Sequence, residues 1–148
     1  MSSVLVVCSA NYCRSPVAEQ ILKSILDEHT IDSAGTSRFF EASMDPRSRA
    51  YLDSISIPRE IHVPKEINKN LILSHNLILA MDIQCLIEIK HKFHKEELNL
   101  KLFASIYREN LSIEDPYKYE DSDEYNRVMN QIKDICYSWA KELKTNKY

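Results

Sequence analysis

The sequence has almost no glycine: Gly35 is the only one in 148 residues, whereas average usage is about 7%. Turns in this chain must therefore rely on Asn, Asp, Ser and Pro, which favour turns by other physical means. The sequence also lacks an apolar run near the ~20 residues needed to span a bilayer, and its first residues carry no charged segment typical of a signal peptide. We therefore expect a cytoplasmic protein without a membrane partner.

A strong net charge and a dense cysteine pattern are absent as well. The formal net charge is −3, so nucleic acid and anionic membranes are not expected partners. Only four cysteines are spread over the chain, which argues against a secreted scaffold held by disulfides. Apolar residues make up 44% of the chain, which is enough for one core. We expect a single domain over residues 1–148.

What the sequence does contain is an alternation of strand-like and helix-like segments. Short apolar runs predict strands at residues 4–7, 30–34, 77–81 and 101–104. Apolar residues at helical spacing predict helices at residues 16–26, 47–52, 83–93 and 121–143. Pro16 suits the first position of its helix and Ser15 the N-cap. The alternation predicts an α/β fold: a single flavodoxin-like domain with a four-stranded parallel sheet flanked by helices on both faces.

Cys8 lies where the first predicted strand ends, at the edge where parallel sheets bind ligands. Five residues later comes Arg14, whose planar guanidinium offers two parallel donors to phosphate oxygens. The backbone N–H groups between them, on a loop that runs into a helix, suit a phosphate dianion. The same positive surroundings favour the thiolate, which is the nucleophilic form of cysteine. A cysteine and an arginine at this spacing often occur by chance. The spacing alone therefore leaves a second interpretation open, in which Cys8 is a buried structural cysteine and Arg14 a surface arginine.

The loop residues have separate expected roles. Those expected to hold the phosphate and support the loop are Ser9, Ala10, Asn11, Tyr12 and Cys13. Asn11 tolerates left-handed geometry better than most residues. The hydroxyl of Ser15 is placed to stabilise the thiolate, a role that competes with the N-cap for the same oxygen.

The loop and several distant segments resemble the low molecular weight protein tyrosine phosphatase family, whose loop reads C-x-G-N-x-C-R-S-P-x-A-E. The loop matches at Cys8, Asn11, Cys13, Arg14, Ser15, Pro16, Ala18 and Glu19. Further matches are Ser33-Ala34-Gly35-Thr36-Ser37, Asp45-Pro46-Arg47, Leu79-Ala80-Met81-Asp82 and Asp115-Pro116-Tyr117. The ending, with Trp139-Ala140 in the last predicted helix, is most similar to bacterial members associated with exopolysaccharide tyrosine kinases.

The resemblance implies a phosphatase that hydrolyses phosphotyrosine and small aryl phosphates through a phosphocysteine intermediate, without metal or cofactor. It implies that Asp115 protonates the leaving group and that Phe39 and Tyr117 form the walls of the substrate slot. The implied partner is a phosphotyrosine-bearing protein, with a tyrosine autokinase as one candidate. Phosphate or another oxyanion is the implied ligand of the active site.

Three supporting residues keep two interpretations each. His62 either orients Asn11 or is a core histidine. Asp82 either steadies the loop arginine or simply ends its strand. Cys13 either forms a reversible disulfide with Cys8, which protects the nucleophile from over-oxidation, or is a small buried side chain.

Two departures from the family pattern keep other functions open. Ala10 stands where the family has Gly, and a Cβ there strains the loop if the position needs an unusual φ. Residues 63–65, Val-Pro-Lys, replace the common x-A-R and are expected to alter surface contacts. The alternatives are a phosphate-binding module without turnover, and a thiol arsenate reductase, which needs two thiols near the third strand where only Cys85 lies. His91 and His94 are expected on a solvated helix face rather than in a metal site.

Overall fold

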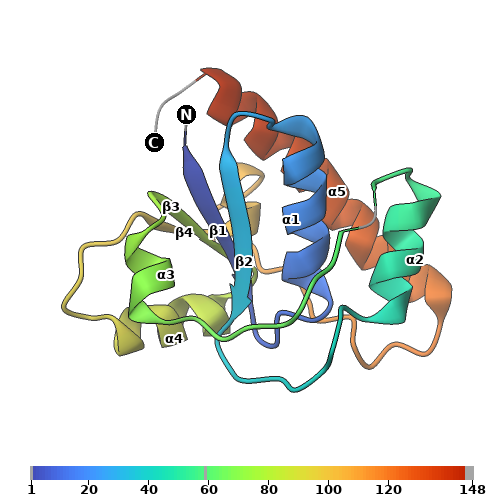
Figure 1. The fold of residues 1–148 in the computed structure, drawn as a ribbon, viewed down its shortest axis with the longest axis horizontal. Helices are drawn as coiled ribbons and strands as arrows, with labels where there is room; N and C mark the ends of the chain where they lie inside the picture. Colours follow the sequence, from blue (N-terminus) through green and yellow to red (C-terminus); the bar gives the residue numbers. More distant parts are fainter. Residues whose placement is uncertain (1, 59, 146–148) are drawn as a thin grey trace.

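A four-stranded parallel sheet forms the centre of the fold (Figure 1). The computed structural model describes residues 2–58 and 60–145. The strands lie in the order β2-β1-β3-β4, with the bounds β1 Ser3–Cys8, β2 Thr30–Gly35, β3 Leu77–Ala80 and β4 Leu100–Leu102. The chain leaves β1 for β2 on one side and returns to β3 on the other. Cys8 therefore ends its strand at the switch point of the strand order, where α/β folds bind ligands.

Helices cover both faces of this sheet (Figure 1). On one side lie α1 Arg14–Ile25, α2 Pro46–Ser54 and α5 Ser122–Thr145, and on the other α3 Lys69–Leu73 and α4 Ile83–Lys92. The predicted α/β fold, with a four-stranded parallel sheet flanked on both faces, is confirmed. Among the helices of the described residues, none combines the length and the apolar character that crossing a bilayer requires.

The side chains of β1 explain why both faces are covered. Val4 and Val6 pack into the core beneath α1 and α5, whereas Leu5 and Val7 pack into the core beneath α3 and α4. All four are buried, so the strand has no polar face and reads as a continuous apolar run. The same alternation points Cys8 toward the α1 side.

The start of α1 differs from its prediction. The helix begins at Arg14 with Cys13 in the N-cap position, where no side chain caps the helix. The prediction of Ser15 as N-cap was wrong, because its side chain lies against the Cys8 thiol instead.

Two further local predictions differ from the structure. The fourth strand ends at Leu102, and Phe103–Ile106 forms a 3₁₀ helix, η1. The carbonyl of Phe103 accepts a 2.6 Å hydrogen bond from the Trp139 indole rather than from a strand partner. The five-residue helix α3 was not predicted, because its single turn is too short to show helical periodicity.

Candidate active site

The loop after β1, called here the Cys8 loop (residues 8–14), turns at Asn11. Asn11 has φ 55°, the left-handed conformation that Asn tolerates. Its amide nitrogen donates at 2.9 Å to the hydroxyls of both Ser15 and Ser33, and its side-chain oxygen accepts from the Lys65 backbone N–H at 3.0 Å. The imidazole Nε2 of His62 lies 2.8 Å from the Asn11 carbonyl. Three separate segments therefore fix this turn, and the interpretation of His62 as the residue that orients Asn11 agrees with this contact.

Gly35, the only glycine of the sequence, packs against the backbone of the turn at Asn11. A Cβ at Gly35 would lie 2.8 Å from the Ser9 carbonyl oxygen, 2.9 Å from the Ala10 carbonyl carbon and 2.9 Å from the Asn11 nitrogen. All three are backbone atoms, which cannot rotate away as a side chain can. The end of β2 and the Cys8 loop approach so closely that only glycine fits.

The departure at Ala10 does not carry the strain that the sequence suggested. Ala10 is absent from the left-handed region, which in the described backbone contains Asn11, Ser56 and Asn110. The loop therefore needs its unusual φ one residue later, at a position that holds Asn.

Arg14 is the most deeply enclosed charge of the site, with 1% of its surface exposed. Its Nη1 donates at 2.7 Å to the Asp82 carboxylate and at 2.7 Å to the Ile113 carbonyl. Its Nη2 lies 3.4 Å from the Ser9 hydroxyl and 3.9 Å from the Asp115 carboxylate. The interpretation of Asp82 as the residue that steadies this arginine agrees with that contact.

The charges around Arg14 hold it in its ionised form. Burial opposes its positive charge, but Cys8 and Asp82 raise its pKa above the ordinary value. Burial likewise opposes the Asp82 carboxylate, but the hydrogen bond from Arg14 holds its pKa below the usual range. The fork therefore keeps its charge and a fixed orientation in a site shielded from water.

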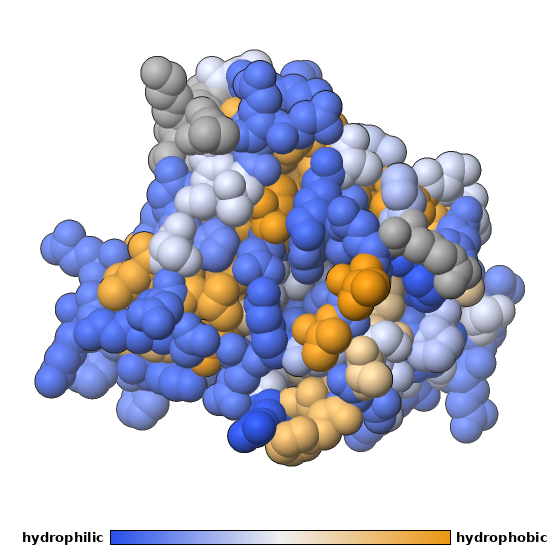
Figure 2. Space-filling model, in the orientation of Figure 1, coloured by the Kyte–Doolittle hydropathy of each residue, from blue (hydrophilic) through white to orange (hydrophobic). Residues whose placement is uncertain are grey.

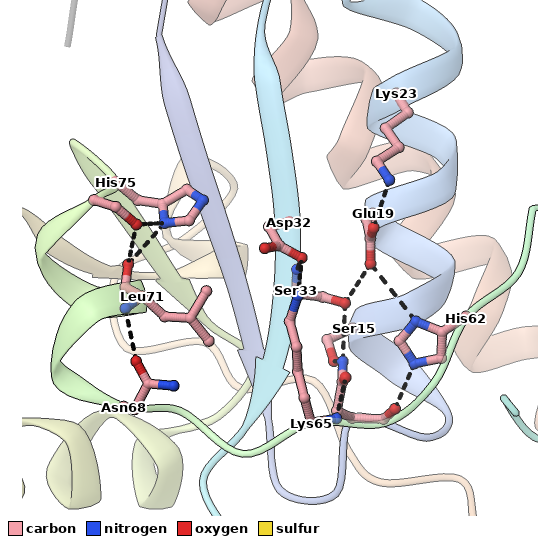
Figure 3. A network of polar contacts seen from close by, with 12 residues as sticks. Ser15, Glu19, Lys23, Asp32, Ser33, His62, Lys65, Asn68, Leu71 and His75 are labelled. Carbon is pink, nitrogen blue, oxygen red and sulfur yellow. Dashed lines mark hydrogen bonds and ion pairs between the residues drawn. The ribbon is translucent and has the colours of Figure 1, made fainter. Parts of the chain in front are cut away.

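A network of polar side chains runs beside α1 from Ser15 to Lys23 (Figure 3). Ser15 lies 2.9 Å from the Cys8 thiol, and Asn11 links Ser15 to Ser33. Ser33 in turn donates to Glu19.

At its outer end the network is anchored by ion contacts. Lys23 pairs with Glu19 at 2.7 Å, and His62 Nδ1 approaches Glu19 at 3.8 Å. We assigned no role to Glu19 or Ser33 from the sequence. Glu19 follows Ser15 by one helical turn, and this spacing was the available signal that both face the loop.

The second loop of the site, called here the Asp115 loop (residues 114–120), is more open. The side chain of Asp115 is 47% exposed, and one of its oxygens accepts from the Tyr117 backbone N–H at 3.1 Å. Arg47 holds this loop by donating to the carbonyls of Tyr119 at 2.6 Å and Tyr117 at 2.9 Å.

Arg47 belongs to the first turn of α2, which contacts both loops. Asp45 caps this helix and accepts from the Arg47 guanidinium at 2.8 Å and 3.0 Å. These hydrogen bonds hold the pKa of Asp45 below its usual value, although burial opposes the shift. On the Cys8 side, the Asp45 N–H donates to the Tyr12 carbonyl at 3.0 Å, and Ser48 donates to the Cys13 carbonyl at 3.0 Å. The sequence identified this segment only as a match, and its bridging position was missed.

The two loops, together with Phe39, line a pocket of about 90 Å³. Its lining consists of Cys8, Ser9, Ala10, Tyr12, Cys13, Arg14, Phe39, Asp115 and Tyr117. The structure thus brings together nine of the thirteen predicted site residues. The other four lie outside this lining. Ser15 and Asp82 contact the lining residues Cys8 and Arg14, whereas Asn11 and His62 support the turn of the Cys8 loop.

Three aromatic rings surround the pocket. The Tyr12 and Phe39 ring centres lie 4.7 Å apart, and Tyr117 lies 6.1 Å from Tyr12 and 6.5 Å from Phe39, all with edge-to-face geometry. Phe39 and Tyr117 were the predicted walls, and Tyr12 joins them as a third. The neighbouring aromatic residues Phe40 and Tyr119 do not line the pocket.

The thiols of the described chain are all free. Cys13 points toward the Asp45 carboxylate at 3.5 Å, and burial raises its pKa. Cys85 lies in the first turn of α4 with its side chain buried, and burial raises its pKa too. Within residues 2–58 and 60–145, no group of three or more His, Cys, Asp and Glu side chains is arranged to hold a metal, and His91 and His94 are both exposed.

Comparison with known proteins gives matches along nearly the whole chain. The family model described as "Low molecular weight phosphotyrosine protein phosphatase" matches residues 3–148. A protein of that name from Dictyostelium discoideum is 30% identical over 170 residues, covering 96% of this chain and 93% of the relative. The Erwinia amylovora tyrosine phosphatase AmsI has a TM-score of 0.87 at 26% identity, covering 96% and 93%. A mutant of the YwlE arginine phosphatase has a TM-score of 0.90 at 24% identity, covering 98% and 97%, and shows a shared fold.

Proposed function

Because this chain belongs to the low molecular weight phosphotyrosine protein phosphatase family, we propose that it hydrolyses phosphotyrosine through a phosphocysteine intermediate. The observation that carries this proposal is the placement of three groups in one pocket: the Cys8 thiol, the Arg14 guanidinium and the Asp115 carboxylate. The thiol has a hydroxyl partner 2.9 Å away in Ser15. A nucleophile, an oxyanion-binding cation and a proton donor thus face one small volume.

In the first step the Cys8 thiolate attacks phosphorus and the bond to the phenolic oxygen breaks. The substrate phosphate meets the Arg14 Nη2, because Nη1 is committed to Asp82 and Ile113. The N–H groups of the Cys8 loop and the start of α1 stabilise the negative oxygens. The Ser15 hydroxyl stabilises the thiolate before attack.

Asp115 supplies the proton that the leaving phenolate needs. Its side chain is half exposed at the pocket mouth, 3.9 Å from Arg14, on the side from which an aryl group approaches. In the second step, water attacks phosphorus, Asp115 takes a proton from that water, and the sulfur–phosphorus bond breaks. Inorganic phosphate leaves and the thiolate is restored, so each step uses a protein group and the proposal includes no metal or cofactor.

The aromatic rings favour an aryl phosphate as the substrate. Tyr12, Phe39 and Tyr117 meet edge to face around a narrow slot, which suits a flat ring better than an aliphatic chain. We propose a phosphotyrosine-bearing protein as the partner, with a tyrosine autokinase as the candidate, and the cytoplasm as the site of action.

Neither alternative function gains support from the site. A thiol relay for arsenate needs two further thiols near β3, but Cys85 is a buried residue of α4 and Met81 lies directly beyond the strand end. A binding module without turnover was suggested by Ala10, whose backbone is not in the strained region.

Turnover of p-nitrophenyl phosphate tests the proposal. We expect the wild-type protein to release p-nitrophenol, and Cys8→Ser to abolish this while Cys85→Ser, a thiol outside the pocket, retains it. Retained turnover in Cys8→Ser would exclude the phosphocysteine route. Parallel assays with phosphotyrosine, phosphoarginine and arsenate plus thioredoxin are expected to show activity on phosphotyrosine alone, and a preference for either of the others would redirect the assignment.

A further inference from the structure

A second hollow adjoins the pocket and shares one wall with it. It measures about 540 Å³ and lies between residues 38–42 and residues 63–66, a size typical of ligand-binding clefts. Phe39 lines both this groove and the active-site pocket. We call it the Phe40 groove. In the space-filling view, hydrophobic atoms gather over these two segments, at the lower centre of the face shown (Figure 2).

One wall of the Phe40 groove is fixed to the active site. The Lys65 carbonyl accepts from the Gly35 N–H at 2.8 Å, and the Ile67 N–H donates to the Gly35 carbonyl at 2.8 Å. The Lys65 N–H donates to the Asn11 side chain at 3.0 Å. The distance between this wall and the Cys8 thiol is therefore set by the same residues that set the turn of the Cys8 loop.

The charged residues of this wall line the groove and form ion pairs with partners outside it. Lys65 pairs with Asp32 at 2.7 Å, and Glu66 pairs with Lys92 at 3.5 Å. Neither Asp32 nor Lys92 lines the groove. Beside these paired charges, Val63 is the exposed apolar side chain of the wall.

Two apolar side chains of the groove are unusually exposed. Phe40 is 80% and Val63 57% exposed. Ala42 is also exposed in the groove, whereas Pro64 lines it but is buried. Arg38 also lines the groove and stacks over the Phe40 ring, 4.7 Å from its centre, which steadies the ring. Large exposed apolar side chains that share one groove mark an interaction site.

We propose that the Phe40 groove binds the residues of a polypeptide substrate that flank its phosphotyrosine, in an extended conformation with an apolar side chain against Phe40 and Val63. This inference rests on the proposed phosphatase function. Its occupant follows from continuity: a chain whose phosphotyrosine enters beneath Phe39 continues over the other side of that ring. Residues 63–65, where the sequence departs from the family pattern, therefore contribute to the choice of substrate.

The test compares two phosphotyrosine peptides that differ only next to the phosphotyrosine, one with Leu or Ile there and one with Ser. We expect wild-type kcat/KM to be roughly tenfold higher for the apolar peptide, as for removal of one interface anchor. Phe40→Ser and Val63→Ser should each reduce this ratio toward one. Leu73→Ser, which removes from α3 a side chain about as exposed as Val63 (51% against 57%), should leave the ratio unchanged.

The outcomes separate the two proposals. If the wild type turns over p-nitrophenyl phosphate and both peptides equally, the phosphatase function stands and the groove proposal is overturned. If no substrate is turned over, the proposed function itself fails. A wild-type dimer in sedimentation that Phe40→Ser converts to monomer, with no peptide preference, assigns the groove to a second copy of this chain and also overturns the proposal.

Discussion

Comparing the Cys8 loop with the Asp115 loop shows two different ways of holding reactive groups at one pocket. In the first, Asn11 and Arg14 are almost fully buried, and each is held by several hydrogen bonds from distant segments. In the second, the side chain of Asp115 is 47% and Tyr117 50% exposed, and Arg47 holds the backbone from one side.

The difference follows from what each loop has to do. Stabilising a phosphate oxyanion depends on donors that are fixed in place before the substrate arrives. The group that protonates a leaving phenolate has to lie where the aryl ring enters and leaves, so it stays accessible to solvent. The bridge between the two is the first turn of α2, in which Asp45 contacts the Cys8 loop and Arg47 the Asp115 loop. The four substitutions below test this contrast.

Asp115→Asn tests the more exposed Asp115 loop and is expected to have the largest effect. Loss of a positioned acid costs about 10²–10⁴-fold in rate, and the loss should be greater for phenyl phosphate, a poor leaving group, than for p-nitrophenyl phosphate. The measurement is kcat/KM for both esters, with Glu120→Gln as a control for an exposed carboxylate of the same loop. An equal loss for both esters would mean that Asp115 acts through Arg14 rather than as the acid.

Gly35→Ala tests the buried Cys8 loop. Its Cβ would lie 2.8 Å from the Ser9 carbonyl oxygen and 2.9 Å from two further backbone atoms, so the Cys8 loop has to shift. Overpacking of this kind costs about 1–3 kcal/mol of stability, and a displaced nucleophile costs up to about 10²-fold in kcat. Urea unfolding and p-nitrophenyl phosphate turnover measure both quantities. A variant with normal stability and turnover would show that the loop is not held as tightly as the contacts indicate.

The two loops also differ in how much of their structure could be predicted from the sequence. The fold and the nucleophile loop were readable, because the apolar strand before Cys8 and the spacing to Arg14 are local signals. The residues that support the two loops could not be predicted, because Ser33, Glu19 and Arg47 act through contacts between segments far apart in the chain. Gly35, the only glycine of the sequence, matters because it lies against the backbone of the Cys8 loop. No local sequence pattern predicts that contact.

Arg47→Lys tests the bridge between the loops. Lysine keeps the charge but loses the planar fork that reaches the Tyr117 and Tyr119 carbonyls together with Asp45. We expect a loss of about 1 kcal/mol, or roughly fivefold in kcat. The loss should be larger for phenyl phosphate than for p-nitrophenyl phosphate, since Asp115 is the group displaced. Arg49→Lys on the same helix, whose guanidinium pairs with Asp53, is the matched control. A loss independent of the leaving group would assign Arg47 to overall stability alone.

Ala10→Gly tests whether the rigid loop tolerates its Cβ, and we expect the smallest effect. Because Ala10 is outside the left-handed region, glycine relieves no strain there, and kcat/KM for p-nitrophenyl phosphate should stay within about twofold. Stability should fall by about 0.4–1 kcal/mol, because glycine widens the unfolded ensemble. Ala42→Gly, in the exposed loop after β2, controls for that unfolded-state effect. A tenfold gain in turnover for Ala10→Gly would show that the alanine restrains the Cys8 loop. The loop that the hydrogen bonds hold most rigidly would then not have the geometry that gives the fastest turnover.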